Sequence, residues 1–526
     1  MMRNLISNLL LTWFAVKALP CRLSYTRKRP EGDTEEEGDA KARLVAKDLK
    51  CKYTKPKETT YSGVPTSEGF RLVIASTDIE KGDELSSTDF DTAFLQSFKW
   101  KDGKLVLISY YDAFLKETVY EWIDGVIYGM QEGSRDWQNT LAYIMTTNLS
   151  FKKIKNMESM YYNAEHQVTV PCHVDDPLVK ARGSENTKWF HQEINKLLDT
   201  KGERLLTPGG SVLDYLSIII SLTHDGDICL DNHIRINDTL QKMGLAQCNP
   251  TKEPINRALI KALADAEKES QRCSEEEHSL AWTALGEAQW LSQTTHPVLA
   301  TAVSMYSSYM SKGLAGSLNA MKHLWRYISS VKDHCLIRRK GNNDGLQVWV
   351  DGDWAGLYCL TGEKRSRTGI LVTYNGMPVA WKSCFQQCKG SMAKDTGTPE
   401  DMHQISTSSG ESEIHAAAEA AKLGRHIKYV LEEINAPVSD SIPVFVDAGA
   451  ALGFIGNTCS IGRMKHIDLR DSWVEQLRRK DFLKWTKVPG TENKADTFTK
   501  ILMGAEFARG TQGLMVPLPS QGGMLE

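Results

Sequence analysis

The sequence lacks the signatures of several large classes of protein. Its 526 residues contain no Cys-x-x-Cys pair, and 11 cysteines scattered along so long a chain do not indicate a disulfide framework. No apolar run is long enough for a membrane-spanning helix. Lysine and arginine (63) do not outnumber aspartate and glutamate (66), so the chain has no overall positive charge. Any polyanionic ligand must therefore be held by local basic residues or by metal ions.

Motifs of three common enzyme classes are also absent. The chain has no His-Glu-x-x-His zinc motif, no Walker A loop and no Gly-x-Ser-x-Gly elbow. Zinc-dependent proteolysis, nucleotide hydrolysis at a P-loop and α/β-hydrolase chemistry are therefore disfavoured. What is present is an ordinary globular composition, with 41% hydrophobic and 25% charged residues. The chain is long enough for two or three domains.

Changes in composition divide the chain into five predicted segments. Residues 1–20 form an apolar tail that polar residues interrupt. Residues 21–248 alternate short apolar runs with helical periodicity, which is an α+β pattern. Residues 249–345 are predicted to hold two helices followed by a linker. Residues 346–505 are predicted to form three strands and then alternating helices and strands, with a tail over 506–526. The predicted fold class is a multidomain protein of the α+β and α/β type.

The clearest secondary-structure signals lie in the segment that begins at residue 346. Strands are predicted in succession at 346–350, 369–373 and 379–382. An Asn-Gly pair at 375–376 separates the last two and is a strong hairpin signal. Ser408 has the spacing of a helix N-cap. This segment therefore combines a sheet with at least one long helix.

Carboxylates beside predicted strands indicate metal sites. Acidic side chains next to buried strands are costly unless they are paired or bind a cation. Asp89 leads into an apolar run, and the adjacent Asp175 and Asp176 follow an apolar strand. Adjacent like charges repel each other unless a cation lies between them. A solvated turn remains the alternative interpretation of such a pair.

A second set of carboxylates lies at the ends of elements in the C-terminal segment. Its members are Asp351, Glu413, Asp447 and Asp496. Taken singly, Glu413 could favour a helix dipole and Asp496 could be an ordinary first-turn residue. As a set they predict a site for two divalent ions about 3.5–4 Å apart, which would stabilise the attacking and leaving oxygens of a phosphoryl displacement. Polymerisation and phosphodiester hydrolysis both need that arrangement.

The order of these motifs resembles the reverse transcriptase and ribonuclease H portion of a copia-type retrotransposon Pol polyprotein, from about residue 21 to 502. Residues 41–46 resemble the family's fingers motif, residues 89–95 its first palm motif, and residues 173–176 its Tyr-Val-Asp-Asp motif. Further matches follow in order at 128–137, 286–297, 324–327, 351–356, 408–413, 465–468 and 495–500. Ordered matches over nearly the whole chain are more specific than any single motif.

The resemblance implies a right-hand polymerase with fingers, palm and thumb, followed by a helical connection and a ribonuclease H-like mixed five-stranded sheet with helices. The implied function is an RNA-directed DNA polymerase joined to an RNA–DNA hybrid ribonuclease. Each active site would use two Mg²⁺ ions, with Mn²⁺ as the alternative. The implied partners are an RNA template, a DNA primer, the RNA–DNA hybrid and deoxynucleoside triphosphates, without a membrane. A cytoplasmic or nuclear location is expected, and the oligomeric state stays open.

By the same resemblance, the polymerase carboxylates and metal ligands are Asp89, Asp175 and Asp176. The residues placed at the nucleotide are Lys41, Arg43, Phe94 and Glu132. Arg43 would contact the incoming triphosphate. Phe94 would lie beneath the sugar, where an aromatic ring excludes a ribose 2′-OH, and a plain core phenylalanine is the alternative interpretation.

The metal ligands that the resemblance implies for the nuclease are Asp351, Glu413, Asp447 and Asp496. His466 would assist product release or bind the backbone of the hybrid, with a histidine on a helix surface as the alternative. Of two neighbouring glutamates in the predicted helix, we expect Glu413 rather than Glu411 to point into the site.

Departures from the family pattern bear on polymerase activity. Glu132 replaces a glutamine near the nucleotide, and its charge is expected to weaken triphosphate binding. Pro171 and Pro177 flank the two adjacent aspartates and are expected to disturb the pairing of their strands. The nuclease quartet is intact. The alternative function is therefore a decayed or domesticated retroelement fragment that binds nucleic acid without polymerase turnover.

Overall fold

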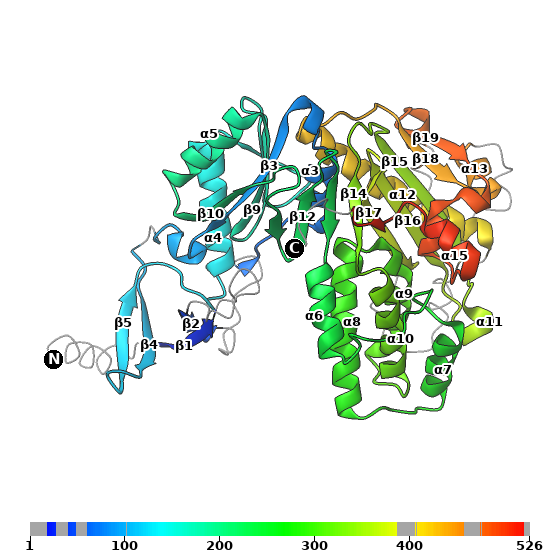
Figure 1. Cartoon of the computed structure of the whole chain (residues 1–526), viewed down its shortest axis with the longest axis horizontal. Helices are drawn as coiled ribbons and strands as arrows, with labels where there is room; N and C mark the ends of the chain where they lie inside the picture. The colour runs from blue at the N-terminus through cyan, green and yellow to red at the C-terminus, as the bar shows by residue number, and fades with distance from the viewer. Residues whose placement is uncertain are drawn as a thin grey trace. The chain divides into compact units, whose positions relative to one another are not determined.

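The computed structural model describes most of the chain and divides it into two compact units (Figure 1). The described residues are 18–27, 40–48, 60–100, 103–386, 406, 408–456, 474 and 476–519. Unit 1 comprises Met1–Pro65, Ser87–Val179 and Ser184–Glu203, and unit 2 comprises Thr66–Ser86, Lys180–Gly183 and Arg204–Glu526. No helix in the described part of the chain is both long and apolar enough to cross a bilayer.

A four-stranded sheet in unit 1 has the order β2-β1-β4-β5. Its strands are β1 (Leu19–Arg27), β2 (Ala40–Ala46), β4 (Val106–Asp112) and β5 (Glu117–Ile123). β1 pairs antiparallel with β2 and parallel with β4. An isolated bridge joins Val45 in β2 to Tyr128, and the backbone N–H of Ala46 donates to the carbonyl of Tyr128 at 2.7 Å. This bridge places Tyr128 beside the strand that carries Arg43.

A six-stranded sheet of order β10-β3-β9-β8-β7-β6 carries the acidic residues of the first segment. Its strands are β3 (Asp83–Phe90), β6 (Lys152–Lys153), β7 (Met160–Asn163), β8 (Val168–His173), β9 (Asp176–Arg182) and β10 (Thr200–Leu205). The helical elements of this part are η3 (Ala93–Gln96), α4 (Gly133–Tyr143), η4 (Ile144–Asn148) and α5 (Ser184–Asn195). β3 and β9 contribute residues to both units because the unit boundaries fall within these strands.

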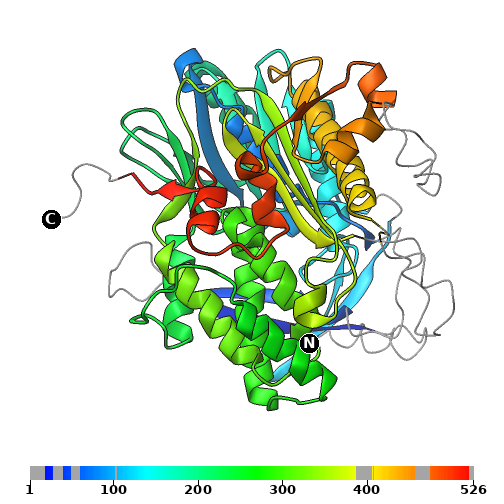
Figure 2. The same ribbon diagram turned by 90° about the vertical axis from the view of Figure 1, so that its right-hand side faces the viewer.

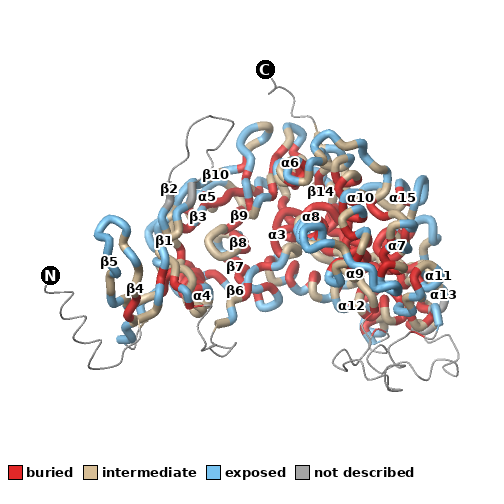
Figure 3. The backbone as a smooth tube through the Cα atoms, turned by 90° about the horizontal axis from the view of Figure 1, so that it is seen from below, coloured by how far each residue is buried: buried red, intermediate tan, exposed pale blue. Residues whose placement is uncertain are grey.

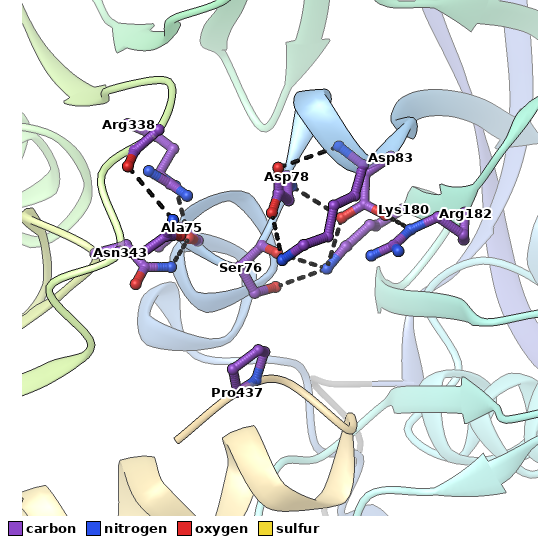
Figure 4. Close-up of polar contacts among 12 residues, drawn as sticks. Ala75, Ser76, Asp78, Asp83, Lys180, Arg182, Arg338, Asn343 and Pro437 are labelled. Carbon is purple, nitrogen blue, oxygen red and sulfur yellow. Dashed lines mark hydrogen bonds and ion pairs between the residues drawn. The ribbon is translucent and has the colours of Figure 1, made fainter. Parts of the chain in front are cut away.

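A buried ion-pair cluster fixes the start of β3 against the end of β9 (Figure 4). The side chain of Asp83 is 1% exposed, accepts a hydrogen bond from Arg182 Nε, and lies 3.3 Å from Lys180 Nζ. Lys180 also donates to the carbonyl of Ser76 at 2.7 Å. A buried carboxylate is stable only when it is paired and hydrogen-bonded. The cluster therefore favours the one strand register that satisfies Asp83.

Unit 2 contains a helical block and a second five-stranded sheet. Its helices are α3 (Ser67–Ala75), η2 (Ile79–Lys81), α6 (His233–Lys242), α7 (Arg257–Lys268), α8 (Glu275–Thr294), η5 (Pro297–Leu299), α9 (Ala300–Met310) and α10 (Ser317–Ser330). The sheet has the order β11-β12-β13-β14-β20. Its strands are β11 (Leu213–Tyr215), β12 (Ile218–Leu222), β13 (Ile228–Asp231), β14 (His334–Arg338) and β20 (Val516–Pro517).

The helical block differs from its prediction in two ways. Where two helices were expected up to residue 328, α8 ends before Pro297, which begins η5, so α8 and α9 are separate. Proline lacks the N–H that a continuing helix needs. The polar stretch before α8 contains α7, whose apolar face buries Ile260 and Leu263. Polar composition there marks the solvated face of this helix.

The C-terminal sheet of unit 2 has the order β17-β16-β15-β18-β19 and is mixed. Its strands are β15 (Leu346–Asp353), β16 (Arg367–Tyr374), β17 (Met377–Phe385), β18 (Ile442–Val446) and β19 (Leu483–Lys487). β15, β16 and β17 pair antiparallel, whereas β15, β18 and β19 pair parallel. The turn at 375–376 has positive φ at both residues (50° and 76°), which asparagine and glycine tolerate.

Helices and turns surround this C-terminal sheet. They are α11 (Tyr358–Thr361), α12 (Ser409–Glu433), α13 (Gly449–Ile455), η8 (Gly490–Glu492), η9 (Lys494–Phe498) and α15 (Gly504–Thr511). Figure 2 shows the long helix α12 lying along the strands, and α12 packs on β15 and β16. Buried alanines and Gly424 on the inner face of α12 permit this close packing.

A buried arginine connects three segments of unit 2. Arg71 lies in α3, most of which is buried (Figure 3), and is 2% exposed. Its Nε donates to the carbonyl of Val379 at 2.8 Å, and its Nη1 donates to the carbonyls of Gln293 (2.6 Å) and Thr294 (2.9 Å). The guanidinium also lies 4.1 Å from the centre of the Trp381 ring. Burial lowers the pKa of Arg71 to about 10, so the group remains charged at neutral pH.

Candidate functional site

The strand ends of unit 1 bring the predicted polymerase carboxylates into one region. Asp89 is exposed near the end of β3, Asp176 begins β9, and Asp175 lies in the turn between β8 and β9. The backbone N–H of Phe90 donates to the carbonyl of Asp175 at 3.0 Å. The end of β3 therefore lies directly beside the turn that carries the adjacent aspartates.

Trp137 holds this turn in place. Its indole Nε1 donates to the carbonyl of Val174 at 2.7 Å, its side chain is 1% exposed, and its ring packs edge-on against Phe90 at 5.6 Å. Val174 has a φ of 59°, a conformation that β-branched residues rarely adopt. The hydrogen bond from Trp137 stabilises a strained turn next to Asp175. The sequence marks Trp137 only as part of a motif and does not indicate this role.

Arg43, Tyr128 and Phe94 form a contact group in the same unit. The guanidinium carbon of Arg43 lies 5.6 Å from the centre of the Tyr128 ring, and Phe94 meets that ring edge-on at 5.1 Å. Burial raises the pKa of Tyr128, while nearby Arg43 lowers it and Asp175 raises it. Arg43 Nε is buried and has no hydrogen-bond partner among the described residues. An anionic group of a ligand would satisfy that atom.

Gly129 allows Tyr128 to lie close to β2. It has a φ of +85°, and a Cβ there would lie 2.2 Å from the carbonyl oxygen of Ala46. Any other residue would push Tyr128 away from β2. The contact between Tyr128 and Arg43 therefore depends on glycine at this position.

Glu132 is paired rather than isolated. Its carboxylate lies 3.3 Å from Lys104 Nζ, which also lies 4.5 Å from the centre of the Trp100 ring. The partner lies 28 residues away in the sequence, where no pattern announces it. The charge that was expected to weaken triphosphate binding is thus partly neutralised. Lys41 lies in β2, but its side chain is outside the described residues, as is the whole of His466.

Both prolines lie within strands, and at Pro171 the expected loss of pairing is not found. Pro171 lies in β8 opposite Met160, and the pairing of β7 with β8 runs without a shift from residue 168 to 171. The next residue continues it, because Cys172 N donates to the carbonyl of Ser159 at 2.9 Å. Pro177 is the second residue of β9, a position at a strand start that tolerates proline.

In unit 2, three of the four C-terminal carboxylates converge. One oxygen atom each from Asp351, Glu413 and Asp447 lies within 4.8 Å of the other two. Asp351 is near the end of β15 and Asp447 directly follows β18, which runs parallel to β15. The carboxyl ends of neighbouring parallel strands meet at the same edge of a sheet. A carboxylate oxygen set of this kind suits hard divalent cations such as Mg²⁺.

The start of α12 supplies the third carboxylate. Ser408 caps this helix by accepting a hydrogen bond from Glu411 N. Glu413 Oε2 accepts a hydrogen bond from Gly352 N at 3.1 Å, whereas Glu411 lies 3.5 Å from Nε2 of His415. A Cβ on Gly352 would lie about 3.0 Å from the backbone of α12. Glycine is therefore needed for β15 to approach the helix at Glu413.

Asp496 reaches the group through a lysine rather than directly. Lys500 Nζ lies 2.8 Å from Asp496 Oδ1 and 3.5 Å from Asp351 Oδ1. The hydroxyl of Thr499 donates to Asp351 Oδ2, and Asn493 Nδ2 donates to Asp447 Oδ1 at 3.2 Å. Lys500 and Thr499 fall in the motif at 495–500, but no pattern in the sequence assigns either side chain to the site.

Burial and mutual repulsion raise the pKa values of these carboxyl groups. The pKa of Glu413 rises to about 8, mainly because the group is buried and further because Asp351 and Asp447 are near. The pKa of Asp496 rises to about 6, mainly because the group is buried and further because of the charge of Asp351. Burial also raises the pKa of Asp351. The cluster is thus short of positive charge, and Lys500 is the cation that the described residues place in contact with it.

These pKa values predict that the metal-free chain loses stability as the pH rises. Glu413 ionises near pH 8 when folded and near 4.5 when unfolded, so the folded state holds more protons between these values. The free energy of unfolding therefore falls as the pH rises through this window and levels off above it. We expect the thermal midpoint to drop by about 5 °C, measured by calorimetry in chelator. Glu413→Gln should show a smaller drop, and an equal drop would contradict the assignment.

Comparison with known proteins shows what the chain is similar to. Residues 9–257 match the family described as "Reverse transcriptase (RNA-dependent DNA polymerase)". The chain is 23% identical over 477 residues to the "Retrovirus-related Pol polyprotein from transposon TNT 1-94" of Nicotiana tabacum, covering 89% of this chain and 33% of that protein. It is 24% identical over 518 residues to the Pol polyprotein from transposon RE2 of Arabidopsis thaliana, covering 97% of this chain and 33% of that protein. Residues 9–257 therefore form a reverse transcriptase domain, and most of the chain is similar to Pol polyproteins of copia-type retrotransposons.

The match over residues 9–257 assigns a reverse transcriptase domain to the part of the chain that contains Asp89, Asp175 and Asp176. The domain has a polymerase-type fold. The carboxylates of unit 2 lie beyond residue 257, but within the length shared with the Pol polyproteins. The chain spans about a third of the length of these relatives. A foamy viral protease–reverse transcriptase structure in complex with double-stranded DNA aligns over 93% of this chain and 69% of that one, at 11% identity and a TM-score of 0.24, too low to add to the argument.

Proposed function

We propose that this chain is an RNA-directed DNA polymerase joined to a ribonuclease that cleaves the RNA of an RNA–DNA hybrid. The observation that carries the proposal is the convergence of Asp351, Glu413 and Asp447 at one sheet edge, in a chain whose residues 9–257 match a reverse transcriptase family. The two halves would serve successive steps, because a hybrid is the product of copying RNA into DNA. Each centre would use two Mg²⁺ ions, with Mn²⁺ as the alternative.

In the polymerase half, this proposal gives Asp89, Asp175 and Asp176 the role of metal ligands. The unpartnered Nε of Arg43 supports a contact with the triphosphate of the incoming nucleotide. Phe94 packs against Tyr128, which supports a ring wall beside the sugar. The substrates would be an RNA template, a DNA primer and deoxynucleoside triphosphates.

In the nuclease half, Asp351, Glu413 and Asp447 would hold a divalent ion, and Asp496 would complete the set. Divalent ions bound there would stabilise the attacking and leaving oxygens of the phosphodiester. The chain's own contribution is orientation: Gly352 N positions Glu413, and Asn493 positions Asp447. Both support a preformed ligand set. We propose action in the cytoplasm, the nucleus or both, where retroelement RNA is copied.

Primer extension and hybrid cleavage in the same preparation test the proposal. Purified full-length protein with Mg²⁺ should extend a DNA primer on an RNA template and cut the RNA of a preformed hybrid. A chelator should stop both reactions, and excess Mg²⁺ should restore them. Failure of both reactions with folded protein, in Mg²⁺ and in Mn²⁺, would reject the proposal.

The alternative is a nucleic-acid-binding fragment without polymerase turnover, and Glu132 is the residue that favours it. Its pairing with Lys104 and the accommodation of Pro177 in β9 weaken that alternative. The double substitution Glu132→Gln with Pro177→Ile distinguishes the two. Primer extension that rises more than about tenfold, against a constant hybrid cleavage, would favour decay of the polymerase half.

Trp137→Phe is expected to lower primer extension without changing hybrid cleavage. Phenylalanine keeps the packing against Phe90 but removes the hydrogen bond to Val174 O. Losing one buried hydrogen bond costs on the order of 1 kcal/mol, so about a fivefold loss in the extension rate is expected, mainly in kcat. Trp122→Phe, which alters an exposed indole of β5 in the same unit, is the matched control. An equal effect of both substitutions would contradict a specific role for Trp137.

A further inference from the structure

Lys500 occupies an unusual position in the carboxylate cluster of unit 2. Its ammonium nitrogen lies between Asp351 and Asp496, at 3.5 Å and 2.8 Å from their oxygens. The side chain of Asp351 is almost completely buried, at 2% exposed, whereas that of Lys500 is 37% exposed. The ammonium thus reaches a buried carboxylate from a stem that is partly in solvent.

The cluster has two positions that could hold a cation, and they differ in whether a basic side chain already lies there. Oxygens of Asp351, Glu413 and Asp447 lie within 4.8 Å of one another, and no basic side chain among the described residues forms an ion pair with Glu413 or Asp447. The second place lies between Asp351 and Asp496, where Lys500 lies. Asp351 borders both places, so a charge at one affects the other.

We propose that Lys500 is a built-in cation that fills the second ion position of the metal-free centre and is displaced when a second divalent ion binds. The proposal rests on the proposed two-ion function of this centre and adds an order to it. The first ion binds the triad of Asp351, Glu413 and Asp447, in which only Asp351 contacts a lysine. The second ion must compete with an ammonium that is covalently part of the chain.

Carboxylates near Lys500 can accept its ammonium group after displacement. Lys500 lines a cavity of about 420 Å³ together with Arg257, Asp353 and Glu506. Asp353 and Glu506 are carboxylates that can receive a lysine. Arg257 is already engaged, because its Nη2 donates to the carbonyl of Ile501 at 3.2 Å. A lysine stem with solvent access can make this move without a change in the backbone.

The expected consequence is weaker binding of the second ion while the ammonium is in place. Removing a unit positive charge at contact distance from a divalent ion strengthens the binding of that ion by at least roughly tenfold, even when solvent screens the interaction. The first ion is farther from the ammonium and should be less affected. In the native chain the second ion would bind well only when a further negative group, such as a substrate phosphate, offsets the lysine.

Counting bound ions tests this inference directly. Mn²⁺ is titrated into full-length protein, and free Mn²⁺ is measured by electron paramagnetic resonance. The background carries Asp89→Asn and Asp175→Asn, which removes ligands of the other centre. Lys500→Met and Lys500→Gln remove the charge, and Lys500→Arg keeps it. Lys484→Met is the matched control, because Lys484 is an exposed lysine of β19 in the same unit.

We expect the unmodified background to bind one Mn²⁺ well and a second at least about tenfold more weakly than the Lys500→Met and Lys500→Gln variants do. Lys500→Arg and Lys484→Met should behave like the background. Equal binding of the second ion with and without the Lys500 charge would overturn the inference and leave the metal centre intact. If the background binds no Mn²⁺ and Asp351→Asn changes nothing, the proposed nuclease function fails instead.

Discussion

Glu413→Gln is expected to abolish cleavage of an RNA–DNA hybrid, whereas Glu411→Gln leaves it nearly unchanged. Glutamine preserves the size of the side chain and the hydrogen bond from Gly352 N, but it removes the charge that holds a divalent ion. Loss of electrostatic stabilisation at a preorganised centre costs about 10³-fold or more in rate. Glu411 lies two residues away and its carboxylate lies beside His415 in the same helix. Its charge therefore acts within α12 and not at the metal site. The measurement is the rate of cleavage of a labelled hybrid at saturating Mg²⁺.

The comparison of these two glutamates is demanding because both lie in the first turns of α12. A substitution that merely loosened the helix would affect cleavage equally at either position. Primer extension by the same preparations reports whether the rest of the chain is intact. If Glu411→Gln were the damaging change, the assignment of the C-terminal centre would be wrong.

Asp175→Asn and Asp89→Asn are each expected to reduce primer extension by about 10³-fold or more, for the same electrostatic reason. Asp91→Asn, two residues after Asp89, should change extension by less than about tenfold, because Asp91 forms an ion pair with Lys201 at 2.5 Å and exposed pairs contribute little. Hybrid cleavage should be unaffected by all three. The measurement is single-nucleotide incorporation on an RNA template.

The activity of the Asp91→Asn variant shows whether Asp89 or Asp91 is the catalytic carboxylate at the end of β3. Full activity of Asp91→Asn with loss in Asp89→Asn supports the residue that the family motif selects. The reverse result would transfer the catalytic role to Asp91, which also lies close enough to Tyr128 to influence its pKa.

Much of the fold follows from local patterns in the sequence. The strands predicted at 346–350, 369–373 and 379–382 lie within β15, β16 and β17, because alternating apolar residues and an Asn-Gly turn leave one register that buries the same face. The N-cap at Ser408 begins a helix as predicted. Where the prediction failed, as at the separation of α8 from α9, the signal at Pro297 was local and was overlooked.

The site was predictable only in its carboxylates. Acidic residues at strand ends carry a recognisable signal, since burying them without a cation is costly. The residues that pair with these carboxylates carry no such signal. Lys104 reaches Glu132 across 28 residues, and Lys500 reaches Asp351 across 149. Such pairs depend on how β-strands and helices pack, and a lysine at either position would look like any solvated surface residue.

The contacts of Arg71 imply that the chain is not modular at the places where its sequence suggests division. This one side chain satisfies carbonyls from the end of α8 and from β17, while α3 itself belongs to the early part of the chain. A fragment beginning at residue 346 would lose the guanidinium, and a fragment ending at 345 would keep a buried charge with fewer acceptors. Recombination or proteolysis at that junction should therefore yield poorly folding halves, and the two parts of the chain would have to be inherited together.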